Sequence, residues 1–285
     1  SKARVVTLPP ADLKERDIAT LNELRASQGT AYGAKTANLG EIVNSKPKGY
    51  VVPPGFGIPI VYYKEHMERS GLDKKVTALL ARSDELNRDL ALRDRELTAL
   101  RDAIRAAPID PELMTSVLAT AKKLNIWGGK KGLFVRSSTN AEDLPGFNGA
   151  GLYDTIANVR DEEALANAIR QVWASVWNAE AYAERDHFGV DHKGVYGAVL
   201  LQLGVNPTAA GVLVTVNMYD PTAEYTYTIN AKKGLGIRVV DGHKRPEEIL
   251  FDYKTNTIRV LARSDEDTRL VFDADGGVKE EAVPE

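Results

Sequence analysis

The segment from residue 133 to residue 159 constrains this chain more than any other part, and it reads LFVRSSTNAEDLPGFNGAGLYDTIANV. Leu133, Phe134 and Val135 form a short apolar run that is typical of a buried strand. We expect this strand to place Arg136 at its end, where a guanidinium can bind phosphate oxygens through two hydrogen bonds. Three hydroxyl residues, 137–139, follow as further donors.

A glycine-rich loop comes next in the same segment. Gly146, Gly149 and Gly151 allow the backbone to approach a ligand and to point N–H groups at an anion. The alternative is a plain connection between strands, but a flexible loop also suits a lid that closes on phosphates. A second apolar run, residues 155–159, follows the loop. Strand, cation, hydroxyls, glycine loop and second strand together indicate a nucleoside triphosphate site.

The composition is that of a soluble globular protein. At 285 residues the chain is long enough for two subdomains with substantial cores. Its 37 basic and 40 acidic residues give a net charge of −3, which argues against a nucleic-acid binder. The absence of cysteine excludes a disulfide framework and fits a cytoplasmic protein. No apolar run reaches the roughly 18 residues of a membrane span, so we expect no membrane association.

The pattern before residue 132 predicts helices. Residues 11–46 have a helical pattern with a break between Gly29 and Gly33, and residues 50–60 form a short extended segment. Residues 61–124 are predicted to be helical almost throughout. Positions 76, 79, 83, 86, 90, 93, 97, 100 and 104 form a stripe that is apolar except at Ser83, which is expected to cap a new helix, and Arg93. Proline residues 108 and 111 are expected to end one helix and start the next.

From residue 132 onward the pattern changes to strands with intervening helices. An amphipathic helix is predicted from Glu162 to Asn178. Apolar, β-branched runs at 195–203, 210–218, 224–230 and 247–252 are separated by turn residues. This succession predicts an α+β fold with an antiparallel sheet in the second half.

Three motifs, taken together, resemble a known family. The first is VRSSTNAEDLPG with the glycine loop, and the second is GAKTANLGE at 33–41, followed by VPPGF at 52–56. The third is GLGIRVVDGHKRPEEILF at 234–251. In this order they resemble the nucleotide-binding domain of the phosphoenolpyruvate synthase and pyruvate phosphate dikinase family. Rifampin phosphotransferase and the glucan, water dikinases contain the same domain.

The resemblance implies an ATP-grasp-like architecture in which two subdomains hold the nucleotide between them. We expect the first part to comprise residues 1–131, with a helical hairpin insertion at about 61–124. The second part, 132–285, would contain the glycine loop and the antiparallel sheet, and would end before the domain does.

The resemblance also implies roles for two cations. Lys35 of the second motif would contact the nucleotide phosphates, and its alternative is a solvated surface charge. Arg136 would clamp a phosphate, and its alternative is an ion pair with Glu142 or Asp143. The remaining nucleotide-binding residues implied by the resemblance are Gly146, Gly149, Ala150, Gly151, Thr155, Gln202, Leu203 and Val205.

Several of these positions have a structural alternative or depart from the family pattern. Thr155 could equally be an ordinary strand residue, and the segment 202–205, whose backbone would meet the adenine edge, could be a strand running into a turn. Leu152 stands where the family usually has glutamine, and the loop sequence GAGLYDT is therefore closer to that of the glucan dikinases. Gly204 replaces a methionine and Ile237 replaces a glutamate.

The implied activity is phosphate transfer from ATP, through a histidine on another domain, to pyruvate. The four histidines of this chain, 66, 187, 192 and 243, are interpreted as surface or capping residues. No metal site is expected here, because the ligands for Mg²⁺ would follow downstream, and the chain alone is expected to be inactive. One alternative is a glucan or antibiotic dikinase. The other is a non-catalytic nucleotide-binding module that docks partners through residues 73–106.

Overall fold

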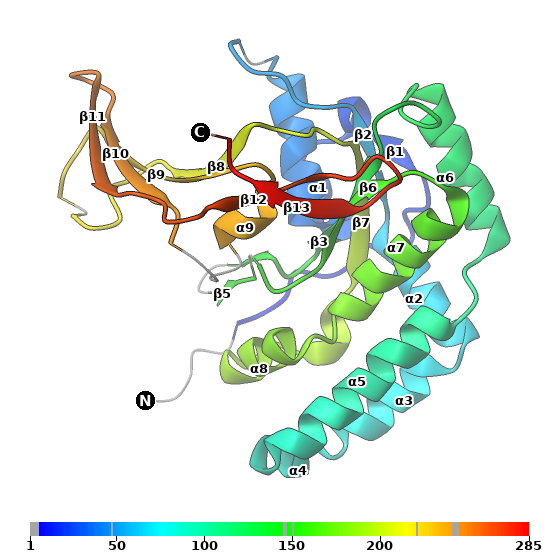
Figure 1. Ribbon diagram of the computed structural model, residues 1–285. Helices are drawn as coiled ribbons and strands as arrows, with labels where there is room; N and C mark the ends of the chain where they lie inside the picture. Colours follow the sequence, from blue (N-terminus) through cyan, green and yellow to red (C-terminus); the bar gives the residue numbers. More distant parts are fainter. Residues whose placement is uncertain are drawn as a thin grey trace. The chain divides into compact units, whose positions relative to one another are not determined.

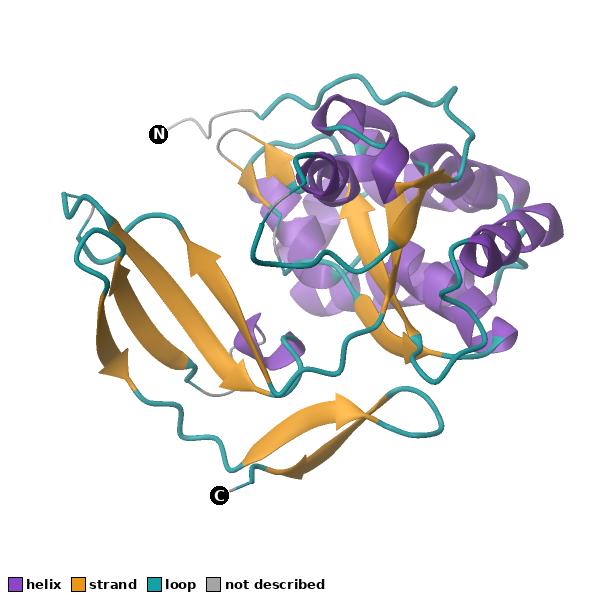
Figure 2. Cartoon of the chain, turned by 90° about the horizontal axis from the view of Figure 1, so that it is seen from above, coloured by secondary structure: helices purple, strands orange, loops and turns teal. Residues whose placement is uncertain are grey.

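The chain divides into two units, one up to Gly204 and one from Val205. The computed structural model describes residues 6–46, 48–144, 147–149, 151–220, 222–240 and 245–284 (Figure 1). Figure 2 shows that helices surround the sheet of the first unit, whereas strands dominate the second. The sequence-based boundary at 131 falls inside the first unit.

A five-stranded sheet forms the centre of the first unit, with the strand order β1-β2-β7-β3-β6 and antiparallel pairing throughout. Its strands are β1 (Ala19–Thr20), β2 (Gly55–Ile58), β3 (Leu133–Thr139), β6 (Thr155–Val159) and β7 (Gly197–Leu203). Because β7 pairs with β2 on one side and β3 on the other, the chain on either side of residue 131 contributes to a single sheet. A short hairpin, β4 (Asp143–Leu144) with β5 (Phe147–Asn148), lies within the glycine loop.

Helices cover both faces of this sheet. Helix α1 contacts β3 and β7, and α2 and α7 also contact β7 (Figure 1). The α-helices are α1 (Gly29–Asn44), α2 (Ile60–Arg69), α3 (Leu72–Leu80), α4 (Ser83–Arg88), α5 (Leu90–Ala106), α6 (Pro111–Lys123), α7 (Glu162–Ser175) and α8 (Ala179–His187). The described residues also include the 3-10 helices η1 (Leu21–Glu23), η2 (Ala26–Gln28) and η3 (His192–Gly194).

The helical prediction is wrong for residues 11–18, which form no helix before β1. It is confirmed for residues 61–124, which form α2 to α6. Local capping explains why α6 begins at Pro111: the Asp110 side chain accepts a hydrogen bond from the Glu112 amide, and Pro111 occupies the first turn. Ser83 opens α4 without a side-chain capping bond.

The predicted apolar stripe is divided among three helices. Its members at 76, 79, 86, 97, 100 and 104 are buried, but Leu90 is exposed, because α5 begins there and the stripe is interrupted between α4 and α5. The prediction for α7 is confirmed: Leu165, Ile169 and Trp173 are buried in the main core. The long helical stretch is therefore a packed part of the first unit.

The second unit is built mainly from antiparallel strands, as predicted for this half of the chain. Its four-stranded sheet has the order β11-β10-β9-β8, and β12 and β13 form a hairpin. The elements are β8 (Ala209–Val214), β9 (Thr226–Lys233), α9 (Ile237–Val240), β10 (Glu247–Asp252), β11 (Thr257–Ala262), β12 (Thr268–Phe272) and β13 (Val278–Ala282). The GLG motif lies after β9, where the Leu235 amide donates to the Leu270 carbonyl.

The combination of helices with antiparallel sheets confirms the α+β class. Within the described ranges, no helix is long and apolar enough to cross a membrane.

Candidate functional site

The lysine motif begins at a kink in α1. Gly33 has φ 75° and ψ 160°, and a Cβ atom there would lie 1.9 Å from the Ser138 carbonyl oxygen. The Ser138 hydroxyl donates to the Tyr32 carbonyl at 2.8 Å and accepts from the Thr36 amide at 3.0 Å. These bonds satisfy backbone groups that the kink leaves without helical partners. The kink thus joins the lysine motif directly to the arginine-bearing strand β3.

Lys35 follows the kink and reaches the same strand. Its Nζ donates to the Ser137 carbonyl at 2.8 Å and lies 3.4 Å from Glu142 Oε1. The Lys35 side chain is 34% exposed, whereas that of Glu142 is 6% exposed. Burial raises the pKa of the Glu142 carboxyl, and the nearby charge of Lys35 lowers it. Lys35 is therefore a half-buried, ion-paired cation rather than a solvated surface charge.

Arg136 lies in the middle of β3, not at the strand end as predicted, because β3 continues through the hydroxyl residues to Thr139. Its Nη1 donates to Gln202 Oε1 at 3.4 Å, and Gln202 Nε2 donates to the Pro53 carbonyl at 2.9 Å. Burial lowers the pKa of the Arg136 guanidinium, and the charge of Glu142 raises it. Glu142, one of the two carboxylates weighed as partners of Arg136, forms an ion pair with Lys35.

The pairing of β3 determines which residues share a face with Arg136. Arg136 is the direct partner of Thr155 on β6 and of Leu200 on β7. Side chains alternate along a strand, so Arg136, Thr155 and Gln202 lie on one face of the sheet. Helix α1 packs on this face next to β2, where a Cβ at Gly57 would meet Thr36 at 2.8 Å. Thr155 is exposed on this face.

The three hydroxyl residues after Arg136 are buried and bond within the fold. Ser137 donates to Glu142 Oε1 at 3.2 Å, Ser138 holds the kink, and Thr139 accepts from the Ala141 amide at 3.3 Å. Their hydroxyls thus have partners within the fold, as buried polar groups require, and phosphate contacts from them stay a prediction.

The glycine loop is anchored at both ends. The Gly149 amide donates to the Glu142 carbonyl at 2.9 Å, and Asn178 Nδ2 donates to the Leu152 carbonyl at 3.1 Å. Gly151 has φ 81° and is exposed. The predicted site residues Gly146 and Ala150 lie outside the described residues.

The adenine-edge segment lies at the end of the central strand. The Leu203 amide donates to the Pro54 carbonyl at 2.9 Å, and the Gly204 amide donates to the Gly132 carbonyl at 2.8 Å. Both amides are thus already engaged within the protein. Val205 is 45% exposed and is the first residue of the second unit.

Two histidines differ from the surface or capping role predicted for them. His66 is buried, and its ring Nε2 lies 3.0 Å from the Ile104 carbonyl, to which it donates. His192 accepts a hydrogen bond at Nδ1 from Arg185 Nε at 3.1 Å and stacks on Tyr182 with ring centroids 4.3 Å apart. His187 is exposed, and His243 lies outside the described residues.

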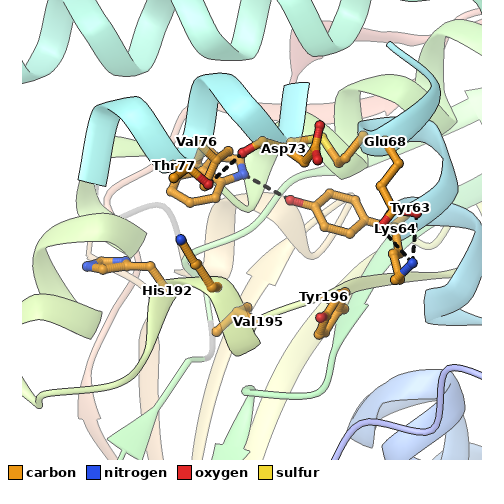
Figure 3. A pocket seen from close by; sticks show the side chains of 12 residues that line it. Tyr63, Lys64, Glu68, Asp73, Val76, Thr77, His192, Val195 and Tyr196 are labelled. Atoms are coloured by element: carbon orange, nitrogen blue, oxygen red, sulfur yellow. Dashed lines mark hydrogen bonds and ion pairs between the residues drawn. The ribbon is translucent and has the colours of Figure 1, made fainter. Parts of the chain in front are cut away.

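A cavity of about 170 Å³ lies elsewhere in the first unit, lined by residues of α2, α3 and the segment from His192 to Tyr196 (Figure 3). Tyr63 forms part of its wall and accepts a hydrogen bond from Trp177 Nε1 at 2.9 Å. None of the residues predicted for the nucleotide site lines this cavity. We therefore place the candidate site at Lys35, Glu142 and Arg136, where the lysine motif meets the arginine motif.

Sequence reasoning did not identify the roles that two residues, Glu142 and Gln202, have in this arrangement. Glu142 was considered only as a partner for Arg136, and Gln202 only for its backbone. The acidic pair within the arginine motif indicated a carboxylate close to Arg136, but not that this carboxylate is buried. No local pattern shows that Glu142 pairs with a lysine more than a hundred positions earlier, because this contact depends on packing of α1 against β3.

Comparison with known proteins gives consistent matches. Residues 30–285 match the family described as pyruvate phosphate dikinase, AMP/ATP-binding domain. A probable phosphoenolpyruvate synthase of Methanothermobacter thermautotrophicus is 32% identical over 283 residues, which covers 98% of this chain and 40% of that protein. A probable phosphoenolpyruvate synthase of Staphylothermus marinus is 32% identical over 268 residues, covering 93% and 31%.

A relative with a different name has the same percentage identity to this chain over a shorter alignment. The rifampicin phosphotransferase of a Streptomyces species is 32% identical over 254 residues, covering 88% of this chain and 27% of that protein. The chain spans between 27% and 40% of the length of these three relatives.

Proposed function

The chain belongs to the family of pyruvate phosphate dikinase AMP/ATP-binding domains, and on this premise we propose that Lys35 and Arg136 of its first unit bind the phosphates of ATP. One observation carries the proposal. Two cations from separate motifs, on α1 and β3, interact with the same buried Glu142 carboxylate, which pairs with Lys35 and whose charge raises the pKa of the Arg136 guanidinium. Two cations close to one another can neutralise the charge of a triphosphate, which is the main requirement of a phosphate site.

The residues around these cations support a phosphate site on one face of the sheet. Gln202 orients Arg136 through its amide oxygen, and Thr155 lies directly opposite Arg136 with an exposed side chain. Arg136 can donate two parallel hydrogen bonds to a phosphate, whereas Lys35 supplies a compact charge. We further propose that the loop residues Gly146, Gly149, Ala150 and Gly151 close over the phosphates.

The adenine base would meet the segment from Gln202 to Val205. Because the Leu203 amide is bonded to the Pro54 carbonyl, that amide would have to be exchanged, or the base would contact other backbone groups of the segment. An ATP-grasp-like architecture, with α2 to α6 as a helical insertion between β2 and β3, fits the observed element order.

Mg²⁺ would accompany ATP in phosphoryl transfer. In the part of the chain that the structure describes, no three His, Asp or Glu side chains gather into a group that could hold a metal ion.

For the whole protein, we propose the synthesis of phosphoenolpyruvate, the activity that the names of the similar synthases state. In this proposal, phosphate would pass from ATP, through a phosphohistidine on another domain, to pyruvate. The second candidate is antibiotic phosphorylation, which the equal identity to rifampicin phosphotransferase favours. Both begin with the same ATP site. The acceptor would be distinguished by incubating the full-length protein with ATP and either pyruvate or rifampicin.

Thermal unfolding in the presence of nucleotide tests the ATP site on this chain. If ATP binds with a Kd in the tens of micromolar, a hundredfold excess should stabilise the fold by about 2–3 kcal/mol. The melting temperature should then rise by several degrees, and less with adenosine, which has no phosphates. Equal, negligible shifts with millimolar ATP, AMP and adenosine, with or without magnesium, would refute the proposal.

A further inference from the structure

The two members of the Lys35–Glu142 ion pair differ in exposure, and this difference indicates which of them can move when a nucleotide binds. The Glu142 side chain is 6% exposed and is fixed by the Ser137 hydroxyl at 3.2 Å, whereas the Lys35 side chain is 34% exposed. A lysine on a flexible four-carbon stem can leave its partner, but a carboxylate bonded inside the fold cannot readily follow. Lys35 is therefore the movable member of the pair.

The same two groups would compete with a nucleotide phosphate. Lys35 Nζ directs donors to the Ser137 carbonyl and towards Glu142 Oε1, and both are acceptors of the kind that a phosphate oxygen would replace. The charge of Glu142 also raises the pKa of the Arg136 guanidinium, so one buried negative charge interacts with both of the cations proposed to bind phosphate. A triphosphate entering the site meets repulsion from this carboxylate as well as attraction from the cations.

Glu142 is also connected to the glycine loop. Its carbonyl accepts the Gly149 amide at 2.9 Å, and its side chain holds Lys35. One residue thus links the position of the lysine with the base of the loop.

We propose that Glu142 serves as an internal substitute for phosphate. Its carboxylate holds Lys35 against β3 in the nucleotide-free chain, and a phosphate oxygen of the bound triphosphate replaces the carboxylate as the partner of Lys35. Glu142 is then a positioning residue that sets ATP affinity, and the exchange of one anion for another releases the lysine. This inference rests on the proposed ATP site, but its first consequence, the hold on Lys35, can be measured without nucleotide.

Lysine acylation tests that hold. Wild type and Glu142→Gln would be treated with a limiting amount of an acylating reagent, and modification of Lys35 would be quantified by peptide mass spectrometry. Lys64, which pairs with Glu68 on the surface, is the internal reference. We expect Lys35 to react several-fold faster in Glu142→Gln, since the amine is no longer held by a carboxylate, and to be largely restored in Glu142→Asp. Unchanged Lys35 reactivity would overturn the proposal.

Calorimetric titration tests the exchange. ATP, inorganic tripolyphosphate and adenosine would be titrated into wild type, Glu142→Gln and the control Glu85→Gln, whose carboxylate pairs with Arg82 at the surface. We expect Glu142→Gln to bind ATP and tripolyphosphate about three- to tenfold more tightly, with adenosine unchanged, because a competing negative charge is removed. Weaker ATP binding by Glu142→Gln would overturn the proposal.

The two experiments separate the inference from the proposed function. If wild type binds neither ATP nor tripolyphosphate, the proposed function fails and so does the exchange. Lys35 acylation then still decides whether Glu142 holds the lysine. If wild type binds ATP and Glu142→Gln behaves identically in both assays, the proposed function stands and this inference fails.

Discussion

Lys35 Nζ lies 2.8 Å from the carbonyl oxygen of Ser137, a residue 102 positions further along the chain. The bond joins the lysine motif on α1 to the strand that carries Arg136. It forms only because the kink at Gly33 brings the start of α1 against β3. The spacing of the two cations therefore depends on helix–strand packing and not on a local motif.

Gly33→Ala should destabilise the first unit by more than about 2 kcal/mol. A Cβ would lie 1.9 Å from the Ser138 carbonyl oxygen, and the residue adopts φ 75°, which is unfavourable for alanine. Urea unfolding measures the change. Gly129→Ala is the matched control, because a Cβ there meets no atom within 4 Å, and it should change the free energy of unfolding little. Equal effects of the two substitutions would contradict the described role of the kink.

Gln202→Leu should weaken ATP binding about three- to tenfold, because Arg136 loses the amide oxygen that orients it. Adenosine affinity should change less, since Arg136 is assigned to the phosphates. Calorimetry of both ligands measures the difference. Gln171→Leu, which removes a surface bond to Asp154, should leave ATP affinity unchanged. Wild-type ATP affinity in Gln202→Leu would show that Arg136 needs no such support.

The stability of the first unit should fall as the pH drops below about 6.5, the pKa of histidine in an unfolded chain. Burial and the neighbouring Arg185 lower the pKa of His192 to about 3. Between these values the unfolded state binds more protons than the folded state, so the free energy of unfolding rises with pH, by up to about 1.4 kcal/mol per unit for this group. Protonation at Nδ1 would also disrupt the bond from Arg185 Nε.

Chemical denaturation at several pH values between 4 and 7, roughly the accessible part of this window, checks the prediction. His192→Asn should reduce the slope relative to wild type, whatever its effect on the stability at neutral pH. His187→Asn, which alters an exposed histidine, should leave the slope unchanged. The same slope in His192→Asn and wild type would show that His192 does not titrate as described.

The sequence predicted what depends on periodicity and on motifs. The helical stretch at 61–124, the strands at 155–159 and 247–252 and the antiparallel second half follow from hydrophobic patterns that the structure confirms. The helical pattern predicted over 11–46 is wrong for residues 11–20, which form irregular backbone and then β1. Amphipathic spacing in a short segment does not reveal whether tertiary contacts support a helix.

The site was predicted less completely because it is assembled from distant segments. Lys35 and Arg136 were identified as candidates from their motifs, but their connection through Glu142 requires knowledge of how α1 packs. The hydroxyls of residues 137–139 suggested phosphate donors, and in the structure they are buried and bond to the protein's own backbone and to Glu142. A sequence shows which groups can form hydrogen bonds, but their partners depend on the fold.

Calorimetric titration of ATP into wild type and into the double variant Lys35→Ala/Arg136→Ala tests the central claim most directly. We predict that wild type binds ATP with a Kd in about the tens of micromolar and that the double variant binds at least about a hundredfold more weakly, because two phosphate-binding cations are lost. The control Lys64→Ala/Arg69→Ala removes two cations of α2 that lie outside the candidate site, and should bind as wild type does. Wild-type ATP affinity in Lys35→Ala/Arg136→Ala would contradict the account.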